Sequence, residues 1–201
     1  LVLDVAGGLG ATGRWLAGRL GCTAVVTAAD VGEAAAGRAL TRRTRQRGQV
    51  HHVAADPAAL PFRDARFTHA WIVETLPCVP DVETVIADVF RVIRPGGFVA
   101  LQDVARSDGG NPPELPGWRF ATAAAQRDAL ARAGFADVVV RPVDDSREHS
   151  ARVSAARAQL QHLLAASGEQ RLATLAAERA ALATALADGR LQVVQLFARR
   201  P

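Results

Sequence analysis

Residues 1–13 read LVLDVAGGLGATG, and this stretch decides how the chain is interpreted. Leu1 to Val5 form a short apolar run interrupted only by Asp4, the pattern of a buried parallel strand. A glycine cluster follows at once, and from Ala11 the apolar residues take helical spacing. Strand, glycine turn and helix N-terminus come in the order that nucleotide-type cofactors require, so the stretch predicts a ligand site.

The glycines of this stretch allow more than one interpretation. Gly8, Gly10 and Gly13 spell G-x-G-x-x-G, the dinucleotide fingerprint. Asp30, 20 residues after Gly10, stands where that fingerprint places a ribose-binding acid. This interpretation predicts an NAD-type oxidoreductase. A glycine-rich turn without any ligand is a further alternative.

The other interpretation starts from the acid that precedes the glycines. The spacing D-x-A-x-G-x-G from Asp4 to Gly10 resembles motif I of the class I S-adenosylmethionine-dependent methyltransferases, in the Ala-Gly-Gly variant of quinone-biosynthesis members. In that family the loop wraps the methionine part of the cofactor, and the acid helps to position its ammonium group. A carboxylate at this place suits a cationic sulfonium amino acid better than a pyrophosphate, because it repels the two phosphates.

Two further motifs extend the resemblance along the chain. Asp56 closes an expected strand and is followed by Leu60-Pro61-Phe62, which is similar to the family's adenine-binding segment: an acceptor for an exocyclic amine inside an apolar slot. Residues 91–97, RVIRPGG, resemble the family's turn into its fifth strand. The ordered set covers residues 1–104, and a dinucleotide dehydrogenase has no reason to carry it.

The resemblance implies an α/β fold with a doubly wound, Rossmann-like sheet of seven strands in the order 3-2-1-4-5-7-6, strand 7 being antiparallel. It implies S-adenosylmethionine as the cofactor and S-adenosylhomocysteine as its product, with Asp30 on the ribose and Asp56 on the adenine. Asp30 also suits a helix N-cap, and the two roles are compatible. The residues expected around the cofactor are Asp4, Ala6, Gly7, Gly8, Gly10, Asp30, Val31, Asp56, Pro57, Val73 and Glu74.

Apolar patterns and turn residues predict where the remaining elements lie. We expect a helix over 32–45 and a second one that begins after Asp81 and ends at the Arg94-Pro95-Gly96-Gly97 turn. The strands expected after the first are 23–29, 50–54, 67–73, 98–102, 135–143 and 191–198.

Catalysis of methyl transfer needs few groups. The reaction is an in-line displacement at a sulfonium, so it depends on positioning the acceptor, and a base is needed only if the acceptor must lose a proton. Our candidates for a base are Asp103, at the end of a strand, and His149, for which a solvated surface position is the alternative. The family often has histidine where Cys78 stands and aspartate where Thr68 stands. These departures leave open a non-catalytic binding protein with the methyltransferase fold.

The region after the fifth strand is the least generic. Residues 104–117 are expected to form a polar loop, with Trp118 and Phe120 lining an apolar pocket or packing at a helix start. Residues 146–188 carry two tandem helical patterns, which we interpret as a helical cap inserted between strands 6 and 7. A dimerisation hairpin is the alternative, since the same spacing forms coiled-coil seams. We expect a small acceptor that is mostly apolar or aromatic.

Composition bounds the rest. The 201 residues suit one methyltransferase domain, and Cys22 and Cys78 are too few for a disulfide framework. All 24 basic residues are arginine and the net charge is +4, a bias that does not argue for nucleic acid. We expect a cytoplasmic protein with no membrane partner and no metal, for which a homodimer is one possible assembly. Because the chain starts inside its first strand without methionine, we also expect an N-terminal segment before Leu1.

Overall fold

A seven-stranded sheet forms the centre of the molecule. The computed structural model describes residues 1–143 and 170–201. The strand order is β3-β2-β1-β4-β5-β7-β6, and β7 runs antiparallel to both of its neighbours, whereas β3, β2, β1, β4 and β5 pair in parallel. The predicted fold class and strand order are therefore confirmed.

The elements follow the apolar patterns of the sequence with small shifts at their ends. The strands are β1 (Val2–Val5), β2 (Thr23–Ala28), β3 (Gln49–Ala54), β4 (Phe67–Val73), β5 (Ile93–Arg106), β6 (Ala136–Pro142) and β7 (Leu191–Arg199). The helices are α1 (Ala11–Leu20), α2 (Val31–Arg43), the 3₁₀ turn η1 (Leu76–Cys78), α3 (Val82–Val92), α4 (Ala123–Arg132) and α6 (Gln170–Ala187). Helix α2 thus begins and ends earlier than the helix predicted over 32–45.

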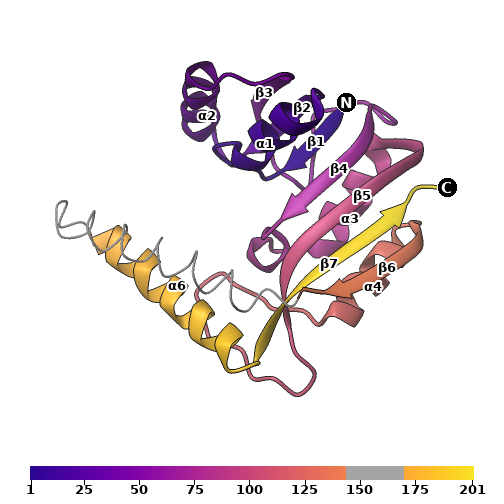
Figure 1. The fold of residues 1–201 in the computed structure, drawn as a ribbon. Coiled ribbons are helices and arrows are strands. Elements are labelled where there is room, and N and C mark those ends of the chain that lie inside the picture. Colours follow the sequence, from indigo (N-terminus) through magenta and orange to yellow (C-terminus); the bar gives the residue numbers. More distant parts are fainter. Residues whose placement is uncertain (144–169) are drawn as a thin grey trace.

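The helices lie on opposite faces of the sheet. α1 and α2 pack against β1, β2 and β3, while α3 and α4 pack on the other face of β5, β6 and β7 (Figure 1). The α3 side holds the main core, because alternate residues of each strand point there. Burial of Val85, Ile86, Val89 and Val92 on one side of α3 confirms the amphipathic pattern after Asp81, which caps the helix by accepting from the Thr84 N–H at 3.2 Å.

The end of α3 differs from the prediction. The helix stops at Val92, and β5 begins directly at Ile93, so the Arg94-Pro95-Gly96-Gly97 segment lies within a strand as a bulge. Ile93 pairs with Phe67, and Phe98 pairs with His69. Residues 94–97 of β5 therefore lie opposite the single residue Thr68 of β4. Gly96 accommodates the bulge with a φ of 74°. The motif therefore redirects the chain from helix to strand without a separate turn.

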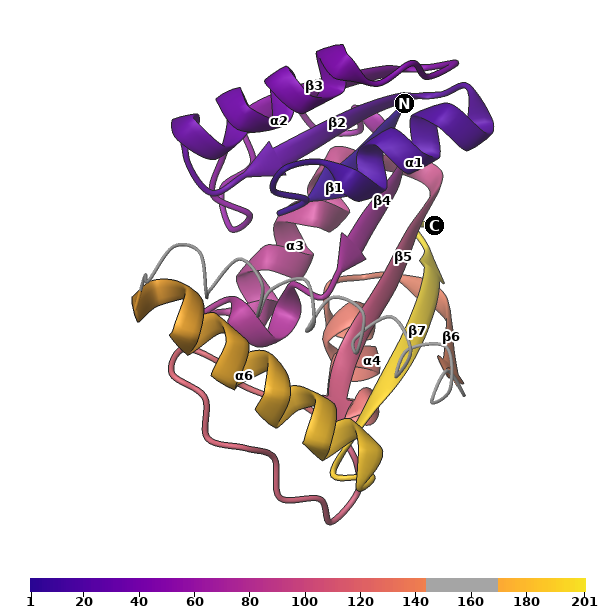
Figure 2. The ribbon, with the colours of Figure 1, turned by 60° about the vertical axis from the view of Figure 1, so that its left-hand side comes forward.

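β5 also ends later than predicted. It pairs with β7 as far as Arg106, opposite Leu191, so Val104 belongs to the sheet and the loop covers 107–122. Val104 and Leu191 form a second apolar cluster with Ala185 of α6. α6 consequently crosses the carboxyl end of β5 and the amino end of β7, as Figure 2 shows. Trp118 and Phe120 precede α4 and lie outside it.

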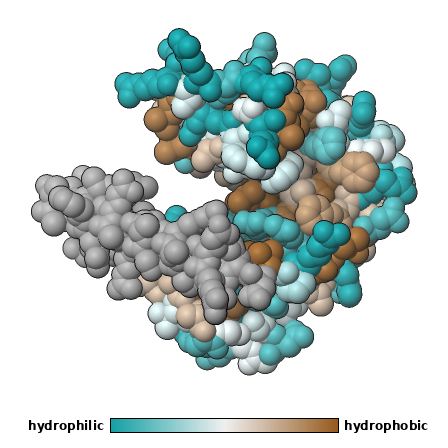
Figure 3. Space-filling model, in the orientation of Figure 1, coloured by the Kyte–Doolittle hydropathy of each residue, from teal (hydrophilic) through white to brown (hydrophobic). Residues whose placement is uncertain are grey.

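One face of the sheet has less cover. Among the described residues, α6 reaches the α1 side of β5 and β7 at Val104 and Leu191, whereas Phe98 (47% exposed), Val139 (45%) and Phe197 (38%) face outward on the same side. Figure 3 shows hydrophobic residues exposed over these strands. No helix of the described parts is long and apolar enough to cross a membrane.

Candidate active site

The carboxylate of Asp4 lies beneath the glycine loop without a partner. Asp4 is 1% exposed, and neither of its oxygens has a hydrogen bond within the described residues. Burial raises the pKa of this carboxyl to about 6, although the nearby N–H of Gly13 offsets part of the shift without reaching hydrogen-bond geometry. A buried acid in this state is stabilised by any cation that can reach it, so it fits the ammonium group of an amino-acid ligand.

The glycine loop between β1 and α1 lies directly on this carboxylate. A Cβ on Gly7 would collide with the Asp4 carboxylate, and Gly8 and Gly10 have φ values of 57° and 80°. Ala6 also has a positive φ, 51°, which costs an alanine about 1 kcal/mol and places strain at the site. The loop is held by a hydrogen bond from the Ala6 N–H to Thr27 Oγ1 at 2.7 Å.

Gly13 has a different role. A Cβ there would lie 2.5 Å from Val26 Cγ2, so the glycine lets α1 pack closely on β2. The close packing of α1 on β2 is enough to explain why residue 13 is a glycine, so Gly13 is not evidence for a dinucleotide. The loop proper ends at Gly10, which precedes the first residue of α1.

Asp30 caps α2. Its Oδ1 accepts from the Glu33 N–H at 2.8 Å. Glu33 Oε2 accepts in turn from the N–H of Ala29, the residue before the cap, at 2.8 Å, which is a variant of the capping box. The expected N-cap is therefore present. Asp30 and Val31 are exposed at the end of β2, and the cap uses only one Asp30 oxygen, so a ribose-binding role remains compatible.

The segment after β3 is fastened to α3. Asp56 Oδ1 accepts from the Ala58 N–H at 2.8 Å, which turns the chain, and Leu60 is buried. Asp88 Oδ2 accepts from the Leu60 N–H at 2.6 Å. Arg91 donates to the carbonyls of Leu60 at 3.0 Å and Phe62 at 2.7 Å.

This fastening joins two of the sequence motifs. Arg91 opens the RVIRPGG motif, and it holds the Leu60-Pro61-Phe62 motif while pairing with Asp88 at 2.7 Å. Hydrogen bonds to Asp88 and Asp64 raise the pKa of Arg91, so its charge is permanent. We did not predict either residue's role. The Asp88–Arg91 spacing of three on the polar side of α3 is the signal that could have indicated an ion pair.

The expected cofactor residues share one edge of the sheet. They follow or end β1, β2, β3 and β4, which are adjacent and parallel, so their carboxyl ends meet. Pro57 is half-buried beside Asp56. Val73 ends β4, and Glu74 follows it with a φ of 51° and donates its N–H to the Gln102 carbonyl at 2.8 Å. A left-handed glutamate here turns the chain away from the sheet edge.

Asp103 lies next to this edge but is enclosed. It is 0% exposed, and its carboxyl accepts from the N–H groups of Leu76 at 2.9 Å and Val104 at 2.8 Å. Burial raises its pKa to about 7 despite these donors. In this arrangement the side chain fastens η1 to β5. His149, the other candidate base, lies outside the described residues.

The two departures from the family pattern, Thr68 and Cys78, have different surroundings in this chain. Thr68 Oγ1 donates to the Leu1 carbonyl at 2.8 Å, which ties β4 to the start of β1. Cys78 is exposed, but burial of its thiol and the nearby charges of Asp103, Glu178 and Glu74 raise its pKa. A protonated thiol is a poor nucleophile, so Cys78 offers no covalent chemistry.

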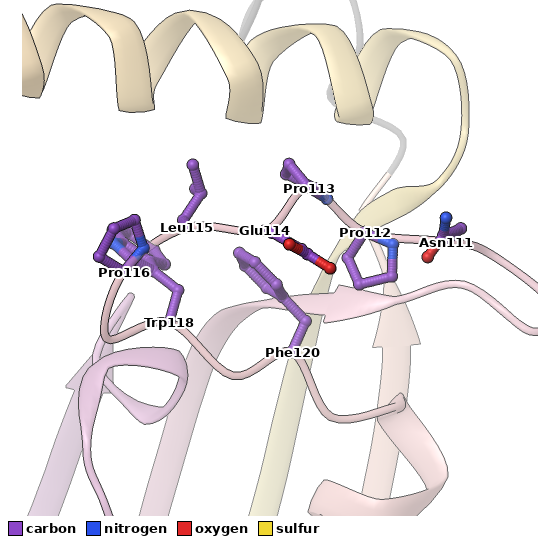
Figure 4. Close-up of a pocket in the computed structure, with 8 residues that line it drawn as sticks. All are labelled: Asn111, Pro112, Pro113, Glu114, Leu115, Pro116, Trp118 and Phe120. Atoms are coloured by element: carbon purple, nitrogen blue, oxygen red, sulfur yellow. The ribbon is translucent and has the colours of Figure 1, made fainter.

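A cavity of about 550 Å³ lies between the 107–122 loop and α6 (Figure 4). Trp118 and Phe120 stack with ring centroids 5.7 Å apart, and Phe120 also packs on the α6 cluster. The Arg119 N–H donates to the Pro77 carbonyl at 2.7 Å, which links the loop to η1. The residues that line the cavity are Asn111, Pro112, Pro113, Glu114, Leu115, Pro116, Trp118 and Phe120.

Comparison with known proteins agrees with this geometry. Residues 3–101 match the methyltransferase domain family. The chain is 32% identical over 103 residues to the methyltransferase GfsG of Streptomyces halstedii (51% of this chain, 37% of that protein). It is 38% identical over 107 residues to the ubiquinone/menaquinone biosynthesis C-methyltransferase UbiE of Shewanella halifaxensis (52% of this chain, 43% of that protein). The chain thus spans less than half the length of these relatives.

Solved structures share the fold along the whole chain. The [4+2]-cyclase SpnF superposes with a TM-score of 0.81 at 21% identity, covering 100% of this chain and 74% of SpnF. The geranyl diphosphate C-methyltransferase of Streptomyces coelicolor A3(2) gives 0.73 at 15% identity, covering 100% of this chain and 70% of that one.

The motifs, the strand order and the family match together decide between the two interpretations of the glycine loop. Residues 3–101 form a methyltransferase domain of the class I, S-adenosylmethionine-dependent type. The cofactor of this family is S-adenosylmethionine, and the buried Asp4 carboxylate under a glycine loop fits its amino-acid end.

Proposed function

We propose that this chain transfers the methyl group of S-adenosylmethionine to a small organic acceptor by in-line displacement. The observation that carries the proposal is the Asp4 carboxylate, which is buried directly under Gly7 and has no hydrogen-bond partner in residues 1–143 and 170–201. A dinucleotide would bring phosphates toward this acid, whereas a methionine ammonium group neutralises it. The cofactor, when bound, supplies an electrophilic methyl group on a sulfonium.

The chain's own residues then bind and orient. Asp4 and the loop from Ala6 to Gly10 hold the amino-acid end, and Asp30 receives the ribose hydroxyls with the oxygen its cap leaves unused. Asp56 and Pro57 lie beside the adenine, with Val31, Val73 and Glu74 completing the wall. These assignments are supported by the shared sheet edge at which the residues end.

The acceptor is proposed to enter from the α6 side. The Trp118–Phe120 stack and the proline-rich loop offer an apolar wall, which favours an apolar or aromatic molecule. We propose that residues 146–188 form a cap over it within a single methyltransferase domain; α6 is the described part of that region. Solved relatives include a geranyl diphosphate C-methyltransferase, whose named substrate carries an apolar chain.

Proton removal is a smaller part of this proposal. The Asp103 carboxyl is enclosed and bonded to two backbone N–H groups, which favours a role in holding η1 over direct contact with the acceptor. An acceptor that is already nucleophilic needs no base, so catalysis would depend on proximity and orientation. His149 stays a candidate for acceptors that must lose a proton.

Titration calorimetry with S-adenosylhomocysteine and with NADH tests the cofactor. We expect binding of S-adenosylhomocysteine alone, and binding of NADH alone would contradict the proposal. Methyl transfer from labelled S-adenosylmethionine to a panel of apolar and aromatic acceptors tests the reaction. Cofactor binding without turnover on any acceptor would favour the second candidate, a protein that uses the fold for another purpose, as the name of the cyclase SpnF illustrates.

A further inference from the structure

His52 of β3 fills the space between the glycine loop and α2. Its side chain is 6% exposed. A Cβ on Gly10 would collide with the imidazole Cε1, and a Cβ on Gly37 of α2 would lie 2.5 Å from both Cε1 and Nδ1. The ring therefore takes the place of side chains at two positions, one in the loop and one in the helix, and both positions must be glycine while the ring is there.

The surroundings of the ring keep it uncharged. Nε2 lies 2.9 Å from Thr41 Oγ1, while Nδ1 has no hydrogen-bond partner within the described residues. The charged groups that face the ring are Arg14 of α1 and Arg38 of α2, and His51, on the exposed side of β3, adds a weaker electrostatic effect. Burial and these basic groups lower the pKa of His52, and contact with the backbone of Gly8 offsets them only in part.

Arg14 and Arg38 also fix the elements around the ring. Arg14 Nη1 donates to the Leu9 carbonyl, in the glycine loop, and Arg38 Nη1 donates to the His52 carbonyl at 3.1 Å. The loop, the first turn of α1, β3 and α2 therefore meet at one imidazole. A second proton on this ring would add a positive charge between two arginines and a donor nitrogen without an acceptor.

We propose that the uncharged His52 ring is a positioning residue that holds Gly8 to Gly10 in the shape that binds S-adenosylmethionine. The inference rests on the proposed function, since this loop is the proposed cradle of the cofactor. His52 itself lies behind the loop and acts through it. Cofactor affinity then depends both on the volume of the ring and on its neutral state.

The volume of the ring is tested by S-adenosylhomocysteine affinity, measured by calorimetry near pH 8. We expect His52→Ala to lose about tenfold in affinity. His51→Ala, on the exposed side of the same strand, should stay within about twofold of wild type. Equal affinities for the two variants would overturn the proposal. Failure of the wild-type protein itself to bind would overturn the proposed function instead.

A second pair of variants separates positioning from general loss of structure. Gly37→Ala forces a methyl group against the ring and should weaken binding about tenfold in the wild-type background. In His52→Ala it should add a much smaller loss, because only the 3.2 Å approach of the new Cβ to the Leu9 carbonyl remains. Gly18→Ala on α1 is the matched control, because its Cβ would meet nothing nearer than Gln46 Cβ at 4.0 Å. If the fold-losses in S-adenosylhomocysteine affinity of Gly37→Ala and His52→Ala multiply in the double variant, the ring does not couple α2 to the glycine loop.

The neutral state of the ring is tested by pH. A histidine with a lowered pKa holds the loop fully above about pH 6.5, and its contribution is lost as the pH falls toward the pKa of the folded state. His52→Phe keeps a ring that cannot take a proton, so it should bind within about threefold of wild type near pH 8. Below pH 6.5 the affinity of this variant should fall less steeply with pH than that of wild type. The two slopes of log affinity against pH should differ by up to one, the value for one linked proton. Parallel pH profiles would refute this part of the proposal.

Discussion

Two buried carboxyls at the same edge of the sheet have opposite surroundings. Asp103, which lies within β5 because the strand continues to Arg106, satisfies both oxygens with backbone N–H groups, and its place is structural. Asp4, in β1, satisfies neither within the described residues and lies under glycines. Burial raises the pKa of both carboxyls. The difference teaches that an unpaired acid, kept at a cost to stability, indicates where a cationic ligand binds, whereas a paired acid does not.

The largest expected effect is that of Asp4→Asn. The variant removes the charge that meets the ammonium group, so S-adenosylhomocysteine affinity should fall by about 100-fold or more, on the order of 3 kcal/mol. The pKa of this carboxyl is raised from 3.8 to about 6, so ionised Asp4 destabilises the unliganded fold increasingly as the pH rises through that interval. Asn should therefore raise the free energy of unfolding by up to about 3 kcal/mol near pH 8 and change it little near pH 4.

Calorimetry and chemical denaturation of the same samples measure both quantities. Loss of affinity accompanied by loss of stability would mean that Asp4 is an ordinary structural acid like Asp103. Retained affinity would contradict its assignment to the cofactor.

An intermediate effect is expected for Arg91→Ala. The variant frees two carbonyls of the Leu60-Pro61-Phe62 segment and the partner acid Asp88, which should cost about 1.5 to 3 kcal/mol of stability. Because this segment follows Asp56, cofactor affinity should also fall, by about tenfold. Arg94→Ala is the matched control from the same motif, since Arg94 is exposed in the bulge of β5. Equal results for both arginines, in melting and in calorimetry, would show that the fastening is unimportant.

The smallest effect is expected for Trp118→Ala. Removing one partner of the Trp118–Phe120 stack should raise the KM of an apolar acceptor by about fivefold, near 1 kcal/mol, because the wall loses an aromatic surface. Affinity for S-adenosylhomocysteine should stay unchanged. If Trp118→Ala weakened S-adenosylhomocysteine binding as much as it raised the acceptor KM, the division of the sheet edge into a cofactor part and an acceptor part would be contradicted. Trp15→Ala is the control, because Trp15 on α1 is exposed and contacts the half-buried Trp71 of β4, away from the 107–122 loop.

The strand ends and turns that carry the predicted cofactor residues could be located from the sequence because the information for them is local. A strand, a glycine turn and a helix start are consecutive in the chain, so the order of residue types in 1–13 is enough to predict all three. The same holds for Asp30 and Asp56, which close their strands, and for Asp81 as an N-cap. Strand order followed from the family that these motifs resemble, and it is confirmed.

The errors lie where distant residues decide. The extension of β5 to Arg106 depends on its pairing with β7, some ninety residues away, and that pairing removed Val104 from the expected loop. The bulge at 94–97 depends likewise on the register of β4. A local pattern carries no information about a partner strand, so element ends were predicted less well than element types.

By itself, the sequence determined the class of fold, the family and the edge of the sheet at which the cofactor residues gather. These follow from short motifs, whose physical requirement is met by neighbours in the chain. Only the tertiary structure decided that Asp4 is unpaired and Asp103 paired, that Arg91 holds Leu60 and Phe62, and that His52 separates Gly10 from Gly37. Each of these depends on burial and on contacts across elements, and such contacts exist only once the chain has packed.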